Sequence, residues 1–568
     1  MKNATKIIAG LTVFATLALS GCGGTPTGSS VDEDAVGYQY ADTSAPIVKA
    51  GSGVNFDLLA PKNALALDYN SMKVFSDLES ATNIHINWSN LTETAYAAKK
   101  NTIMADKTNY PDAIYHAGFT DKEMIQYHTK GVISDLGDYL DYMPNFKALL
   151  TARPDIKQAI TFSDGGIYSL PRIEEMGLKP YPNLLFLNKT FAQKLIDTGK
   201  ASSINAIASD GSAAALKSSD LVDGLKMSRN NYKAMLTAFK DNNIDGNGDT
   251  IPLDFVYGNW QGNQADLFAS FGIPENVEHK TIVNGKVTWT ADTDTFKGAV
   301  NEISSWISDG LIPKTVFEQS QDAFLASGKA SVQKLASFYW WESATVVSNP
   351  NDYIVMQPLV DDASGKQYVG VANNLEIEKG EFVLFEKCAN KKILLTYLDR
   401  FYDPYESAQL NYGPKGIVFE DTLDANGKLV YKDTSASGLT ADELRLKNAP
   451  MGCTGLTKDV WGKVLDMESR AQLRLQRLTA YETPYIYSGD VGIPNITYTS
   501  SEINKLSTIE TSLSSYLDNA ITNWLIHGGV GQGGSDSWDT YTSKLNTIGY
   551  QDVLSINQAG YDRYLAEK

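Results

Sequence analysis

Cysteine, histidine and positive charge are all scarce in this chain of 568 residues. Three cysteines, Cys22, Cys388 and Cys453, are too few for the disulfide framework that holds small secreted domains together. One disulfide between Cys388 and Cys453 is compatible with the sequence, and their redox state is left open. The five histidines are scattered, and no histidine or cysteine cluster has the spacing of a metal site.

Basic residues are outnumbered, with 49 lysines and arginines against 67 aspartates and glutamates and a formal net charge of −18. A chain this acidic repels polyphosphates, so nucleic acid is excluded as a partner. Neutral ligands, or cations such as calcium, fit this charge balance better than polyanions do.

Long apolar runs are absent after residue 22, so no later segment is expected to span a membrane. The apolar stretch from Ile7 to Leu19 follows two lysines and leads into Leu19-Ser20-Gly21-Cys22. This pattern predicts a lipoprotein signal peptide over residues 1–21, with acyl chains such as palmitate on Cys22. An ordinary secretory signal with a chance cysteine is the alternative. The lipoprotein interpretation places the protein on the extracytoplasmic face of a bacterial cell membrane, anchored by lipid.

Beyond Cys22 the chain divides into a linker and a body too long for one core. Residues 22–52 are rich in glycine, serine and polar residues and are predicted to be a flexible tether. From residue 53 the pattern predicts strand and helix in alternation, at Val54–Leu59, Asn70–Thr82, Ile84–Trp88, Ala95–Asp106 and Ala113–Tyr115. Such a β-α-β-α-β run predicts a parallel sheet whose ligand edge lies past the strand ends, near Asn70 and His116.

Two later segments carry a resemblance to a known family. Residues 164–172 contain a turn, a short strand and a proline stop, and residues 184–191 contain a buried strand that runs into a helix. This pair resembles the first crossing between lobes in the family 1 extracellular solute-binding lipoproteins, the carbohydrate receptors of ABC importers. The resemblance is to the long-chain branch that includes oligosaccharide and alginate receptors. Further segments occur in the family's order, at residues 354–359, 393–402, 411–420, 513–526, 538–539 and 559–564.

The resemblance implies an α/β, two-lobed periplasmic-binding-protein-like fold of type 2, with a hinge cleft. Each lobe is expected to be a mixed, mostly parallel sheet flanked by helices. The implied N-lobe covers residues 53–170 and 361–410, and the implied C-lobe covers residues 171–360 and 411–568. The implied partners are a carbohydrate, an ABC permease and its ATPase subunits, and a monomer is expected.

A loop rich in aspartate, asparagine and glycine spans residues 241–250. Its alternating oxygen ligands predict a structural calcium site, while Gly246 and Gly248 permit tight turns. It resembles the start of an EF-hand loop, and family members close a similar loop with a glutamate where this chain has Thr250. That replacement removes one charged donor, so a turn that binds no metal is the alternative. The proposed ligands are Asp241, Asn243, Asp245, Asp249 and the carbonyl of Asn247.

Aromatic residues are plentiful, and four stand in a row from Phe338 to Trp341. Successive side chains point in different directions, so we expect some of them to face solvent or ligand. A pyranose ring stacks on an aromatic plane, and the resemblance implies an aromatic sugar contact at this position. Packing in a core is the alternative for each residue. The predicted ligand contacts here are Tyr339, Trp340, Trp341 and Glu342, with a second group at Tyr257 and Trp260.

Two charged residues and one histidine complete the candidate site. Arg172 and Glu342 can each bond sugar hydroxyls, and Arg172 can also bind a uronate carboxylate. An exposed salt bridge is the alternative for both. His116 is predicted at a strand end, where a surface or hydrogen-bonded role is the alternative to ligand contact.

The predicted function is capture of a carbohydrate by the substrate-binding lipoprotein of an ABC importer. An exported glycoside hydrolase is the rival, but the sequence contains no acid pair singled out by spacing and no hydrolase motif. A receptor that informs a membrane sensor is a second alternative, which the sequence does not separate from the importer.

Overall fold

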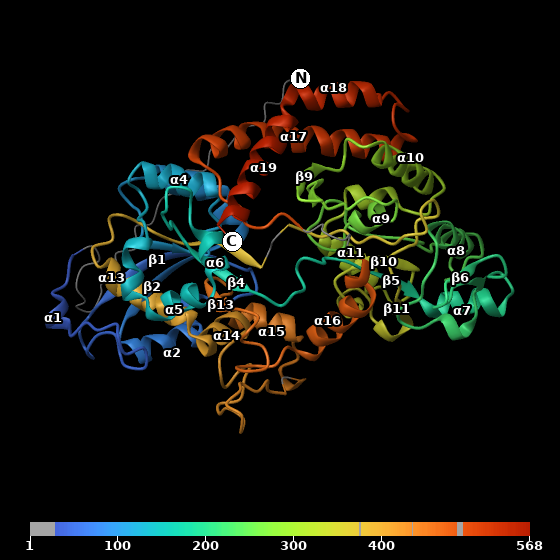
Figure 1. Cartoon of the computed structure of the whole chain (residues 1–568). Coiled ribbons are helices and arrows are strands. Elements are labelled where there is room, and N and C mark those ends of the chain that lie inside the picture. Colours follow the sequence, from blue (N-terminus) through green and yellow to red (C-terminus); the bar gives the residue numbers. More distant parts are fainter. Residues whose placement is uncertain (1–28, 374–375, 434, 486–491, 568) are drawn as a thin grey trace, which may run out of the picture.

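The computed structural model describes residues 29–373, 376–433, 435–485 and 492–567. Figure 1 shows two lobes side by side, with long C-terminal helices that cross from one to the other. The fold is α/β, with sheets flanked by helices, as the sequence predicts.

The first lobe is built on a six-stranded sheet in the order β13-β4-β12-β3-β1-β2. Strands β1, β2, β3, β4 and β13 run parallel to one another, and β12 is antiparallel to both of its neighbours. The predicted β-α-β-α-β run is therefore confirmed. The strands are β1 (Asn55–Lys62), β2 (His85–Thr92), β3 (Ala113–Tyr115), β4 (Leu170–Glu174), β12 (Ile377–Leu384) and β13 (Thr454–Leu456).

Helices cover this sheet because their apolar sides pack on its core. On α2, for example, Val74, Phe75 and Leu78 are buried at helical spacing. The helices of this lobe and its N-terminal extension are α1 (Glu33–Val36), α2 (Lys73–Thr82), α3 (Glu93–Ala105), α4 (Asp121–Thr129), α5 (Pro144–Ala152), α6 (Pro154–Ile160), α13 (Lys391–Asp399), α14 (Pro404–Tyr412) and α15 (Ala441–Asn448).

The second lobe has a three-stranded sheet in which β10 and β11 both pair antiparallel with β5. Its regular ladders are thus antiparallel rather than mostly parallel, and parallel pairing is limited to isolated bridges such as Asp254 with Phe338. Its strands are β5 (Leu184–Asn188), β10 (Ser337–Trp340), β11 (Tyr353–Val355) and two small hairpins, β6–β7 (Asn205–Ile207, Ala213–Ala215) and β8–β9 (Lys280–Val283, Lys286–Trp289). The helices are α7 (Lys189–Asp197), α8 (Arg229–Asp241), α9 (Ala265–Ala269), α10 (Asp294–Ser308), α11 (Gln321–Gly328), α12 (Ser343–Val346) and α16 (Ser469–Tyr481).

The C-terminal helices α17 (Ser500–His527), α18 (Trp538–Ile548) and α19 (Tyr550–Ala566) form a layer over both lobes, seen at the top of Figure 1. Helix α17 packs on α10 of the second lobe and on α4 of the first. Its N-terminus is fixed by a capping box between Thr499 and Glu502.

The predicted boundaries of the two lobes and of the tether differ from the structure. Strands β4 and β13 lie in the first lobe's sheet, so the chain crosses between sheets at residues 175–183 rather than near residue 170, and it stays in the first lobe well beyond residue 410. A three-residue strand such as β13 shows too little periodicity to be recognised in a sequence. The predicted tether also ends early: Ile47 and Val48 are buried, and Val31 N–H donates to the Asn390 side chain.

Candidate functional site

A cavity of about 110 Å³ lies in the second lobe beside the segments that join the lobes. Three loops meet there: residues 260–265, residues 275–278, and residues 370–373 on the second crossing. Its walls carry amide and carboxylate groups from Asn263, Glu278 and Asn373, with the Trp260 indole at its side. Concave, partly apolar surfaces with a few polar groups are typical of small-molecule sites.

Trp260, which lines this cavity, forms an aromatic pair with Trp341. Their ring centroids are 5.7 Å apart, with ring planes at 58°. Trp260 is 45% exposed, an unusually large value for tryptophan, and Trp341 is half-buried. An exposed indole beside a half-buried one offers an apolar face on which a sugar ring can stack.

Polar bonds hold the cavity walls to the interlobe crossings. The Asn183 and Asn263 side chains are joined at 3.1 Å, and Asn263 N–H donates to Asn183 Oδ1 at 3.0 Å. Asp266 Oδ1 accepts from Gly370 N–H at 2.9 Å, and burial raises the pKa of Asp266 to about 6. On the far wall, Asn373 donates to Glu278 at 2.6 Å.

Two of the four neighbouring predicted contacts are core residues. Trp340 is 1% exposed and Tyr339 is 2% exposed, and they belong to cores on opposite faces of β10. The alternation predicted for the aromatic run is present, but both faces of this strand are covered. Both side chains are therefore occupied by core packing, and Trp341, just after the strand, is the residue of this run whose ring pairs with that of Trp260.

The remaining predicted contacts of the second lobe are occupied by protein. Glu342 accepts from Arg470 at 2.6 Å and is mostly buried. Tyr257 packs on the Phe317 ring, with centroids 4.9 Å apart, and burial raises its pKa strongly. The segment 257–260 thus separates into a packed tyrosine and an exposed tryptophan.

Arg172 lies in a buried ion network at the end of β4. Its guanidinium donates to Glu174 at 2.5 Å and to Glu378 at 3.2 Å, and Glu174 also accepts from Arg445 at 3.0 Å. Burial opposes the charge on Glu174, but Arg172 and Arg445 hold its pKa far below the usual range. Because two carboxylates neutralise Arg172, it has little charge left for a uronate, and the ion-pair alternative describes its geometry.

His116 directly follows β3 and has a positive φ of 57°. Its Nδ1 lies 3.0 Å from Glu381 Oε2, and its side chain remains 32% exposed. Burial alone would lower the pKa of His116, but the Glu381 carboxylate raises it. His116 is therefore partly accessible just past the end of β3, while its Nδ1 is buried against Glu381.

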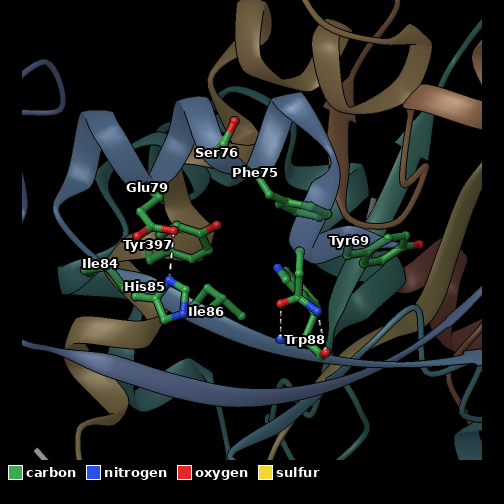
Figure 2. Close-up of a pocket in the computed structure, with 10 residues that line it drawn as sticks. Tyr69, Phe75, Ser76, Glu79, Ile84, His85, Ile86, Trp88 and Tyr397 are labelled. Carbon is green, nitrogen blue, oxygen red and sulfur yellow. Dashed lines mark hydrogen bonds and ion pairs between the residues drawn. The ribbon is translucent and has the colours of Figure 1, made fainter. Parts of the chain in front are cut away.

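The Asn70 side chain bonds the backbone of the sheet's edge strand. Its amide donates to Trp88 C=O at 2.8 Å and accepts from Trp88 N–H at 3.0 Å, which pairs the edge strand β2. The shallow pocket around it, shown in Figure 2, lies between α2 and β2 and holds about 40 Å³. Its outer end is closed by an exposed ion pair of His85 with Glu79 at 2.8 Å.

The predicted calcium loop is a series of tight turns, with positive φ at Asn243, Gly246 and Gly248. The Thr250 hydroxyl donates to Asp245 Oδ1 at 2.6 Å, and Lys334 pairs with Asp249. Asp245 Oδ2 is buried and has no hydrogen-bond partner in the described part of the chain. Nowhere in that part are three or more His, Cys, Asp and Glu side chains grouped as a metal site.

Three other predictions concern the cysteines and the membrane. Cys388 and Cys453 are both free and buried. Cys22 and the signal peptide lie outside the described residues. Among the described helices, none has the length and apolarity that a membrane span requires.

Several residues of the site escaped sequence reasoning. Asn263 and Asn373 are isolated polar residues in loops, Asp266 lies on the short helix α9, and Arg474 is one of several arginines on a polar helix. None belongs to a motif, and only the meeting of three chain segments brings them together.

Comparison with known proteins supports this picture over the whole chain. No protein-family model matches. The sequence is 29% identical over 583 residues to the fructooligosaccharide ABC transporter substrate-binding protein FusA of Streptococcus pneumoniae serotype 4 (strain ATCC BAA-334 / TIGR4), covering 100% of this chain and 98% of FusA. The fold matches FusA in complex with kestose with a TM-score of 0.79 and 28% identity, over 90% of this chain and 100% of FusA.

In sequence and in fold, the chain is similar to the family of substrate-binding proteins of carbohydrate ABC transporters. This family acts outside the cytoplasmic membrane and is not enzymatic, which excludes the glycoside hydrolase alternative. A solute-binding protein associated with an HMO-binding ABC transporter, from Bifidobacterium longum infantis ATCC 15697, shares the fold of this substrate-binding protein at a TM-score of 0.73 and 22% identity, over 90% of this chain and 99% of that one. The alginate-binding protein AlgQ2 shares it at a TM-score of 0.66 and 17% identity, over 90% and 98%.

Proposed function

We propose that this substrate-binding protein captures a neutral oligosaccharide at the Trp260–Trp341 pair and delivers it to a membrane permease. The observation that carries the proposal is the pair of accessible indoles beside a cavity lined by amides and carboxylates. Sugar hydroxyls would bond Glu278 and Asn373, while a ring stacks on an indole. The carboxylates of Glu275 and Glu278, which line the cavity, disfavour an anionic glycan. FusA binds kestose, so fructo-oligosaccharides are the first ligands to test.

A melting-temperature panel tests this proposal. The chain from residue 23 onward is mixed with kestose, maltotriose and a uronate oligosaccharide, and each glycan is recovered to check that it is intact. Ligand at 100 times its Kd stabilises the folded state by about 2.7 kcal/mol. We expect a rise with a neutral oligosaccharide and none with the uronate. No shift with any neutral glycan, or a hydrolysed one, would contradict the proposal.

Two substitutions test where the sugar binds. Trp260→Ala and Trp341→Ala should each weaken binding about tenfold or more, because each removes a stacking surface. Tyr40→Ala is the matched control, since Tyr40 is also exposed, at 37%, but lies in the N-terminal extension. Unchanged affinity in both tryptophan variants would refute the assignment.

We propose in addition that the loop 241–249 binds one structural calcium ion. The buried, unpartnered Asp245 Oδ2 supports this, because an uncompensated carboxylate oxygen is costly. Asp241, Asn243, Asp245 and the carbonyl of Asn247 would hold the ion, as hard oxygen donors. FusA has been studied as an EF-hand mutant, which also supports a metal loop in this family.

A chelator distinguishes the calcium loop from a metal-free turn. Calcium should raise the melting temperature of the protein, and EGTA should reverse the rise. Asp245→Asn should abolish the difference, whereas Asp210→Asn, in an exposed turn closed by Ser212, should preserve it. Identical melting in calcium and EGTA would favour the metal-free turn.

We propose that Cys22 is acylated and holds the protein at the membrane. Support comes from the sequence before it and from the docking of the chain on the first lobe only a few residues later, where Asn390 donates to Ser29 C=O at 3.0 Å. Metabolic labelling with a palmitate analogue should mark the wild type and leave Cys22→Ser unlabelled and released. Equal labelling of both would exclude this anchor.

A further inference from the structure

Arg474, on α16, is a buried arginine that packs against Trp341, one of the two rings of the aromatic pair. It is 2% exposed, and its guanidinium carbon lies 3.7 Å from the centroid of the Trp341 ring. One terminal nitrogen donates to the Trp341 carbonyl and the other to the Tyr181 carbonyl. A guanidinium on one face of an indole is a favourable cation–π contact, and the planar fork reaches two acceptors at once.

Keeping this charge buried is costly. The Nε atom has no hydrogen-bond partner in the described chain, and burial lowers the pKa of Arg474 to about 9. The carboxylates of Glu342, Glu482 and Asp266 oppose that shift. An apolar side chain would fill the space at less cost, so retention of the arginine suggests a role beyond packing.

The partners of Arg474 lie where the lobes are joined. Tyr181 is on the first crossing, two residues before the Asn183 that binds Asn263. Asp266, on α9 next to the cavity-lining Ala265, accepts from Gly370 N–H on the second crossing. Helix α16 itself comes after the return of the chain from the first lobe, and Figure 1 shows it between α15 and the second lobe. Arg470, one turn earlier, bonds both Glu342 of the second lobe and Asp442 of α15.

We propose that Arg474 is a positioning residue, which fixes the Trp341 indole and ties it to the first interlobe crossing. This inference rests on the proposed oligosaccharide site at Trp260 and Trp341. Arg474 covers one face of the indole, so a sugar ring stacks on the opposite face. Its bonds to the Trp341 and Tyr181 carbonyls fix the position and orientation of the indole relative to the first interlobe crossing, residues 175–183.

Binding of kestose by calorimetry tests the proposal with three variants. Arg474→Met keeps the volume but removes the fork, and should raise Kd about tenfold. Arg474→Lys keeps the buried charge with a single donor group and should give an intermediate Kd. It provides the test if the methionine variant fails to fold. Arg477→Met is the matched control on the same helix, where the arginine binds Asp223 at 3.0 Å, and should leave Kd unchanged.

A double-mutant cycle and a spectrum separate positioning from general stability. In the Trp341→Ala background, Arg474→Met should have no further effect on Kd, because the two act through one ring. In the ligand-free protein, Arg474→Met should change the tryptophan emission when Trp341 is present. It should leave the emission unchanged in the Trp341→Ala background. Additive effects on Kd, or emission unchanged by Arg474→Met, would overturn the proposal. If the wild type binds no oligosaccharide but Arg474→Met changes the emission, the binding proposal fails while Arg474 still positions the ring. If the wild type, Arg474→Lys and Arg474→Met all bind with the same Kd, the positioning role alone fails.

Discussion

Single residues decide how close the aromatic pair and its loop can approach β10. Gly262 has a positive φ of 63°, and a Cβ built there would lie 2.0 Å from the Trp340 ring. The loop 258–263 therefore lies directly on the buried indole, and this contact holds Trp260 outward. At His116, by contrast, the side chain is partly accessible, and one buried carboxylate, that of Glu381, raises its pKa.

Gly262→Ala should destabilise the fold by about 3 kcal/mol or more, since it combines overpacking with left-handed strain. Gly211→Ala is the control: its φ is 85°, but a Cβ would have open space, so about 1–2 kcal/mol is expected. Urea denaturation of both variants measures the difference. Similar losses would show that the Trp340 contact is unimportant.

The His116–Glu381 pair should stabilise the protein most in acid. Because Glu381 raises the pKa of His116 above its ordinary value of 6.5, the gain is complete below that value. It is lost as pH rises through the raised folded pKa. Glu381→Gln should thus lower the pKa of His116 in an NMR titration and destabilise the fold more at pH 5.5 than at pH 9. An unchanged titration would contradict the pairing.

At the scale of elements, β4 joins three parts of the first lobe through one carboxylate. Glu174 accepts from Arg172 on its own strand, from Asn411 on α14 at 2.7 Å and from Arg445 on α15 at 3.0 Å. Such a buried acid is costly unless fully paired, and of these three donors one lies on the same strand and the other two on α14 and α15. The network explains why residues 404–456 stay with the first lobe.

Glu174→Ala should cost about 3–5 kcal/mol, because it leaves Arg172 and Arg445 buried without their partner. Chemical denaturation provides the measurement. Glu420→Ala, at an exposed glutamate, should change stability by no more than about 0.5 kcal/mol. A small effect of Glu174→Ala would mean that the two arginines find other carboxylates.

At the scale of the whole molecule, the lobes are joined through the crossing segments 175–183 and 356–373 and by the return into α16. Helix α17 adds a contact to each lobe, on α10 and on α4. A ligand that contacts both lobes favours a closed arrangement by its differential affinity for it.

Small-angle X-ray scattering with and without a bound oligosaccharide should therefore show a smaller radius of gyration in the bound state. Trp341→Ala, at the same ligand concentration, should remain at the ligand-free value. A radius that does not change in wild type at saturating ligand would contradict closure.

Prediction from sequence succeeded where a signal is local or repeated along the chain. The alternation from Val54 to Tyr115 predicted the parallel core of the first lobe, because side-chain period depends on backbone geometry alone. It failed for β13, whose three residues carry no period, and for residues 29–52, whose few apolar positions are spread out among polar ones.

Among the site residues, the sequence determined that aromatic and polar groups for a sugar are present, and the order of segments determined the family resemblance. Only the tertiary structure decided which aromatic residues are accessible: it buries Tyr339 and Trp340 between two cores and leaves Trp260 and Trp341 exposed or half-buried. The same holds for Arg172, which is neutralised by Glu174 and Glu378. Burial and pairing depend on segments far apart in the chain, and no local pattern records which of them meet.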